Sequence, residues 1–160
     1  MARRAAHSGA ANPSRMNETD FIRQQLHLEG AHLRELLHAC AATERPAPAV
    51  AAYLQWAGPR LIDRVLAHHT ALQDSAALAA PLRAQLSAAA AAARQAQAAS
   101  GAQQSAPLRA LLAAWSEPLD AAAGQLLRTA HWRRVAGLTA DRILEERQLY
   151  AAAHASLGRS

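Results

Sequence analysis

Glu29 and His32 are the residues of this chain whose types and spacing most favour chemistry. They are three residues apart, so their side chains share one face of a helix. A carboxylate on an apolar face is costly to bury unless it is paired, protonated or bound to a cation. We therefore predict a pair of metal ligands; the alternative is that Glu29 pairs with an arginine or lies at the edge of the stripe. That stripe repeats in steps of three and four residues, and its apolar members are Ile22, Leu26, Leu33, Leu36 and Cys40.

Three further residues are candidates for the same site, from two other expected helices. His68 lies on an apolar stripe with Leu61, Val65 and Leu72, although a lone core histidine is usually only hydrogen-bonded. Asp141 and Glu145 are four residues apart and share a helix face. Neighbouring arginines offer another explanation for these two acids, as ordinary surface ion pairs worth less than about 1 kcal/mol each.

Together these residues predict a metal site in the middle of a helical bundle. Mixed imidazole and carboxylate ligands suit iron, manganese or zinc, and Glu-x-x-His pairs serve as ligands in di-iron bundles. Two linked metal ions with an open position would support O₂ binding or oxidation chemistry, whereas one ion would only stabilise the fold. The predicted ligands are Glu29, His32, His68, Asp141 and Glu145.

Composition indicates that helices position these ligands. Ala, Leu, Arg, Gln and Glu dominate the chain, and all are good helix formers, whereas it has only three Val and three Ile. Short connections between the first three expected helices favour antiparallel neighbours. We therefore predict an all-α fold, an antiparallel up-down bundle of four to five helices, in which the three tryptophans anchor the core and each needs a partner for its N–H.

The pattern of caps and breakers divides the chain into a tail and one domain. Residues 1–16 are expected to be a disordered tail, with Met16 as an alternative start, and residues 17–157 a single helical domain. The expected helices cover about 17–42, 48–72, 76–99 and 107–156.

Three expectations concern the interior of these helices. The Gly58-Pro59 pair should kink or interrupt the second helix. The alanine-rich half of the third helix should either pack very close to a neighbour or form a mobile outer helix. The last segment is too long for one helix and should break at Ser116-Glu117-Pro118 and again near Gly124 or, preferably, Gly137.

Charge and cysteine content narrow the function classes. The net charge is +5, but the arginines are spread along the chain rather than clustered, which disfavours a nucleic-acid binder. Cys40 is the single cysteine, so the chain cannot form an internal disulfide, and a reducing cytoplasm is expected. No apolar run approaches the roughly 20 residues needed to span a membrane.

Two stretches resemble the hemerythrin-like (HHE) family of four-helix metal bundles. Residues 28–37, LEGAHLRELL, are similar to that family's first-helix histidine segment. Residues 141–150, DRILEERQLY, resemble its HHxxEExxLY helix, with Asp-Arg in place of the two histidines. The family's HxxxH motif of a third helix has no counterpart here. The resemblance implies a helical bundle, and with it iron binding.

Three functions follow as alternatives. The first is a hemerythrin- or ferritin-like bundle that binds a transition metal. The second is a non-enzymatic interaction or adaptor bundle without metal, acting through a protein partner or as a homo-oligomer. The third, less favoured, is an arginine-mediated nucleic-acid binder, whose binding would weaken steeply with salt.

Overall fold

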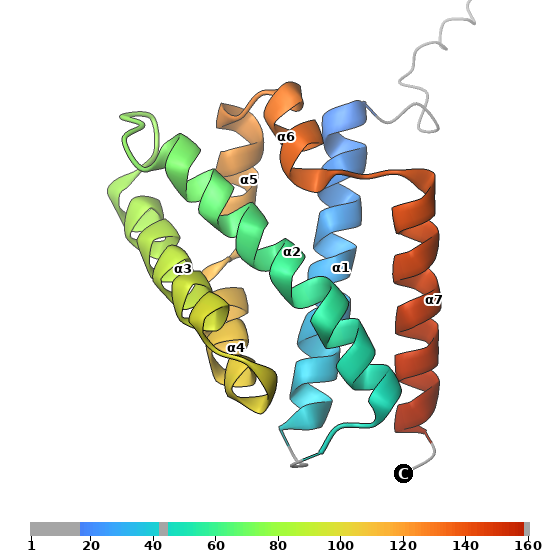
Figure 1. The fold of residues 1–160 in the computed structure, drawn as a ribbon. Coiled ribbons are helices and arrows are strands. Elements are labelled where there is room, and N and C mark those ends of the chain that lie inside the picture. The colour runs from blue at the N-terminus through green and yellow to red at the C-terminus, as the bar shows by residue number, and fades with distance from the viewer. Residues whose placement is uncertain (1–16, 42–44, 159–160) are drawn as a thin grey trace, which may run out of the picture.

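The protein is entirely helical wherever its structure is described. The computed structural model describes residues 17–41 and 45–158, and this part of the chain contains α-helices, one 3-10 turn (η1) and no strand (Figure 1). The all-α prediction is confirmed, and none of these helices is long and apolar enough to cross a membrane. The predicted disorder of residues 1–16 falls outside the described residues. In chain order the elements are α1 Glu18–Cys40, α2 Pro48–Leu72, α3 Ala80–Ala98, η1 Gly101–Gln104, α4 Ser105–Ala114, α5 Glu117–Leu126, α6 Thr129–Ala136 and α7 Ala140–Leu157.

The described residues form seven α-helices rather than four or five because the C-terminal third breaks three times. The predicted break before Pro118 is present, and the Ser116 side chain accepts a hydrogen bond from the Leu119 N–H to cap α5. The preferred break at Gly137 is also present: this residue adopts φ 52°, a left-handed conformation that suits glycine. Gly124 lies inside α5, so the break expected near it is wrong by a few residues and falls at Leu127 and Arg128.

The expected interruption at Pro59 is absent, and α2 continues through it as one helix of 25 residues. Proline removes one helical hydrogen bond. Residues on both sides of it are buried in the core, among them Trp56, Ala57, Leu61 and Ile62. Tertiary packing on both flanks therefore holds the helix together across the missing bond.

Helix α2 forms the centre of the fold. It contacts α1, α3, α6 and α7, and in Figure 1 it crosses α1, with α3 and α4 to one side of it and α7 to the other. The alanine-rich half of α3 is buried through Ala89, Ala90, Ala93 and Ala96 and packs on α4 and α2. The close-packing alternative for this segment is therefore the one observed. The antiparallel up-down order of the helices stays a prediction.

Candidate functional site

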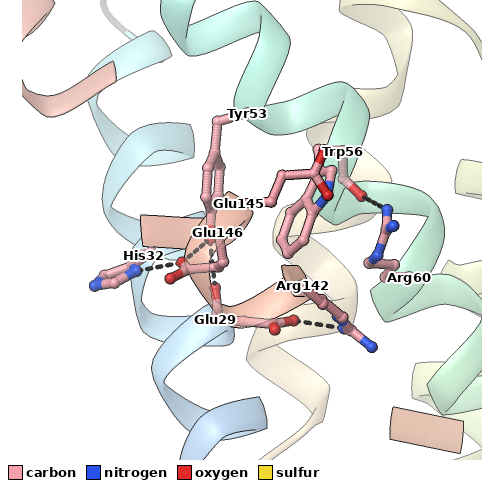
Figure 2. Close-up of polar contacts among 8 residues, drawn as sticks. All are labelled: Glu29, His32, Tyr53, Trp56, Arg60, Arg142, Glu145 and Glu146. Carbon is pink, nitrogen blue, oxygen red and sulfur yellow. Dashed lines mark hydrogen bonds and ion pairs between the residues drawn. The ribbon is translucent and has the colours of Figure 1, made fainter. Parts of the chain in front are cut away.

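The predicted ligand Glu29 is buried, and an arginine neutralises it. Its side chain is only 8% exposed, and its Oε1 accepts a hydrogen bond of 2.8 Å from Nη2 of Arg142 on α7 (Figure 2). The guanidinium of Arg142 also lies 5.7 Å from the ring centroid of Trp56, while its Nε has no hydrogen-bond partner. The ion pair explains how a carboxylate can occupy an apolar stripe: Arg142 supplies the cation that the sequence led us to expect from a metal.

His32, the second predicted ligand, contacts an acid that the sequence did not single out. Its Nδ1 lies 2.6 Å from Oε2 of Glu146, which also accepts a 2.8 Å hydrogen bond from the hydroxyl of Tyr53. Burial, reinforced by the hydrogen bond to Glu146, raises the pKa of Tyr53 well above its ordinary value, so the phenol keeps its proton and stays a donor. One face of the His32 ring is also covered, because it stacks on the Tyr150 ring with 3.5 Å between the ring centroids.

Glu145 takes part in the same cluster but at its edge. It is exposed, and its Oε1 accepts a 2.9 Å hydrogen bond from the indole N–H of Trp56. Arg60 covers that indole, with its guanidinium carbon 4.4 Å from the ring centroid, and donates to the Trp56 carbonyl. One predicted tryptophan N–H partner is thereby identified. Figure 2 shows these side chains converging from α1, α2 and α7.

The remaining two predicted ligands lie elsewhere. Asp141 is exposed in the first turn of α7, and His68 is fully buried among aromatic rings on α2. Across residues 17–41 and 45–158 no three His, Cys, Asp or Glu side chains are grouped so that they could hold a metal ion. The carboxylates of the cluster instead accept hydrogen bonds from Arg142, Tyr53 and Trp56.

The sequence identified the correct helices but the wrong register on α7. The buried face of this helix carries Arg142, Glu146 and Ala153, spaced by four and seven residues, with Leu149 partly buried between them. Glu145, which the sequence predicts as a ligand of the buried site, is exposed instead. The signal for the correct register was Ala153, a small residue that can face a neighbouring helix closely.

A second buried site lies on α2, one helical turn before His68. Arg64 is 7% exposed, and no hydrogen bond or ion pair joins its guanidinium to another residue in the described part of the chain, although its nitrogen atoms are not fully buried. Burial lowers the pKa of Arg64 to about 10, partly offset by the negative charge of Glu29, so it remains charged at neutral pH. Sequence reasoning missed this residue because its spacing resembles that of any surface arginine.

Arg64 lines a cavity of about 300 Å³ between α1, α2, α4, α5 and α6. Gly30 of α1 also lines it, and a Cβ placed on this glycine would meet no atom within 4 Å. Polar residues at the cavity are His27, Arg34, Ser116, Glu117 and Asp120. Its apolar walls are Leu26, Leu61, Leu112, Trp115 and Trp132.

Two nitrogen–nitrogen contacts, which link Arg134, His131 and His68 in a chain, fix the tautomer of His68 behind this cavity. Nη2 of Arg134 lies 3.0 Å from Nδ1 of His131, whose Nε2 lies 3.0 Å from Nδ1 of His68. Because a guanidinium can only donate, Nδ1 of His131 accepts, its Nε2 carries the proton, and His68 carries its own proton on Nε2. Burial lowers the pKa of both histidines, and the charges of nearby arginines lower it further. Both histidines are therefore neutral at pH 7.

This arrangement leaves hydrogen-bond donors unused near the cavity. His68 Nε2 and Trp132 Nε1 are both buried and without a partner. The His68 ring is held by Trp115, stacked at 5.2 Å, and by the edge of Trp132 at 4.8 Å. Both of these buried groups, like the guanidinium of Arg64, are N–H donors.

Comparison with protein-family models, with curated proteins and with solved structures finds no match for this chain. The two stretches that resemble hemerythrin-like proteins lie on α1 and α7, which contact each other. Membership of that family stays a prediction.

Proposed function

We propose that this protein is a cytoplasmic, antiparallel helical bundle that binds a small organic anion in the cavity beside Arg64. The observation that carries the proposal is a largely buried arginine that lines a cavity and has no hydrogen-bond or ion-pair partner among the described residues. A cytoplasmic location is supported by the lone Cys40, and an antiparallel order by the short connection between α2 and α3.

The energetics favour an anion as the missing partner. A buried charge without a counterion costs several kcal/mol, even after relaxation. The charges of Glu29 and Asp120 offset part of this cost, but Glu29 is hydrogen-bonded to Arg142, and neither acid makes a hydrogen bond or ion pair with Arg64. An anion bound in the cavity would remove much of this cost. The binding free energy of an anion therefore includes an electrostatic stabilisation of Arg64 that a neutral molecule cannot provide.

The volume of the cavity and its apolar residues suit a small-molecule site, and about half of its lining residues are polar or charged. Small-molecule pockets are mostly apolar with a few polar groups that fix orientation, and they begin at about 300 Å³. This cavity has that volume, apolar walls that include two tryptophans, and one buried charged group. An interaction or adaptor function, with a protein partner or a second copy, stays a prediction beside this proposal.

The proposal is tested by ligand-dependent thermal stabilisation of the full chain. We expect benzoate, at about 100 times its Kd, to stabilise the native state by roughly 2.7 kcal/mol and to raise Tm by several degrees. Arg64→Met should abolish the shift, whereas Arg60→Met, one turn earlier on α2 and outside the cavity lining, should retain it. An equal shift in Arg64→Met, or none in the wild type with any organic anion, would contradict the proposal.

A further inference from the structure

We infer that the ligand of this cavity is a flat, singly charged organic acid: a carboxylate carried on one or two aromatic rings. This inference rests on the proposed anion site and specifies its chemistry. It draws on three further features of the cavity, namely its charge balance, its aromatic walls and the glycine in its α1 wall.

The charge balance favours a monoanion. Arg64 is the buried charge of the cavity lining, and the other charged residues are two acids and one arginine of the lining, Glu117, Asp120 and Arg34. Asp120 is partly neutralised by Arg23, 4.0 Å away. The lining thus has two arginines and two acids, of which Arg34, Glu117 and Asp120 are exposed or partly exposed and screened by water, so the buried Arg64 is the charge that a ligand would match. A carboxylate matches one guanidinium in charge and geometry, whereas a phosphate dianion would also meet the repulsion of Glu117 and Asp120.

The walls favour a flat ring over a bulky aliphatic body. Trp115 and Trp132 both line the cavity, and both are fixed in place by their contacts with the His68 ring. Aromatic pairs gain stability beyond simple area burial when they stack with an offset or meet edge to face. Fixed rings provide this contact without ordering new side chains, which lowers the entropic cost of binding.

Gly30 supplies the space for such a ring. A glycine inside a helix destabilises it relative to alanine, so its presence in the middle of α1 needs a reason. No neighbouring atom would clash with a Cβ there, so close helix packing is not that reason. Its missing side chain instead widens the cavity between Leu61 and Arg64 on one side and α1 on the other.

The tryptophan indoles provide a site-resolved test. In full-length protein labelled with ¹⁵N-tryptophan, the side-chain N–H signals of Trp115 and Trp132 report on the cavity, and that of Trp56, bonded to Glu145, is an internal control. We would assign the three signals with single Trp→Phe variants. Titrations with benzoate, cyclohexanecarboxylate and inorganic phosphate then compare a flat acid, a puckered acid of similar size and a dianion.

We expect benzoate to shift the Trp115 and Trp132 signals while Trp56 stays unchanged. Benzoate should bind roughly three- to tenfold more tightly than cyclohexanecarboxylate, the advantage of an aromatic contact, and phosphate should bind more weakly than either. Gly30→Leu should weaken benzoate binding at least tenfold by filling the cavity, and circular dichroism would verify that it folds. Gly30→Ala, which leaves most of the space, is the matched control.

The outcomes separate this inference from the proposed function. If cyclohexanecarboxylate or phosphate binds as tightly as benzoate through Arg64, the anion site stands and the flat-acid inference is overturned. The same holds if Gly30→Leu binds benzoate normally while folded. If none of the three compounds moves the Trp115 and Trp132 signals, both the inference and the anion site fail.

Discussion

Arg142 and Arg64 are two largely buried arginines whose surroundings differ. Each arginine is largely buried, and each interacts electrostatically with Glu29. Arg142 bonds to that carboxylate at 2.8 Å in the polar cluster that joins α7 to α1 and α2. Arg64 has no such partner and lines a cavity instead. A buried charge that is paired within the chain stabilises the fold, whereas a buried charge without such a partner indicates a ligand site.

The largest expected effect comes from removing the satisfied arginine. Arg142→Met leaves the buried Glu29 without its hydrogen-bonded counterion, and breaking a buried pair in this way costs about 3–5 kcal/mol. Urea unfolding followed by circular dichroism would measure the loss. The double variant Glu29→Gln, Arg142→Met should recover part of it, since the stranded charge is gone. A loss below about 1 kcal/mol in the single variant would show that the pair behaves like a surface ion pair.

The same substitution at Arg64 should act in the opposite direction. Arg64→Met removes a buried charge that has no partner and replaces it with an apolar side chain of similar length. We expect the free energy of unfolding to rise by about 1–3 kcal/mol in the absence of ligand. The measurement is the same urea titration, and a clear loss of stability would indicate that Arg64 is already compensated inside the protein.

Acid should destabilise the region around Arg64 through its histidines. The pKa values of His68 and His131 are lowered in the folded state by burial and by Arg64 and Arg134, so the unfolded chain binds protons more readily. Stability from this source is complete above about pH 6.5, the ordinary histidine value, and is lost as pH falls toward the lowered folded values. Comparing unfolding at pH 7.5 and 5.5 would measure this loss.

A variant pair separates these histidines from the other groups that titrate. His68→Phe keeps a flat ring between Trp115 and Trp132 and should lose part of the pH dependence. His27→Gln, at an exposed position on α1, should keep all of it. If the two variants respond alike, the buried histidines do not contribute to acid sensitivity.

The smallest expected effect is at Gly30. Because nothing lies within 4 Å of the position of its Cβ, Gly30→Ala should stabilise α1 by the ordinary helix-propensity difference, about 0.5–1 kcal/mol. Thermal unfolding without ligand would detect this gain. A destabilised Gly30→Ala would mean that the glycine is needed for packing rather than for the cavity.

The sequence predicts features that depend on neighbouring residues better than contacts between residues far apart in the chain. Helix starts such as Asn17, whose side chain accepts from the Asp20 N–H, and the left-handed Gly137 are local features and were predictable. The burial of Glu29 also followed from a local stripe. Its partner Arg142 lies 113 residues away, and the choice between Glu145 and Glu146 depends on how α7 is rotated against α1 and α2.

Arg64 shows the limit more clearly. Its importance comes from the absence of a partner, and an absence is a property of the assembled fold rather than of any spacing. The metal site predicted from Glu29, His32, His68, Asp141 and Glu145 combined residues of correct helices that the fold divides between different surroundings. The composition predicted the helices, but only the packing of the helices shows which polar groups lack a hydrogen-bond or ion-pair partner.

Isothermal titration calorimetry of benzoate into the wild type and Arg64→Met at pH 7.5 tests the central claim most directly. The account predicts binding of one benzoate per chain in the wild type, and binding at least tenfold weaker in a folded Arg64→Met variant. Equal affinities in the two proteins would place the ligand elsewhere. No heat of binding with benzoate or larger aromatic acids, together with no thermal stabilisation, would show that Arg64 is not an anion site.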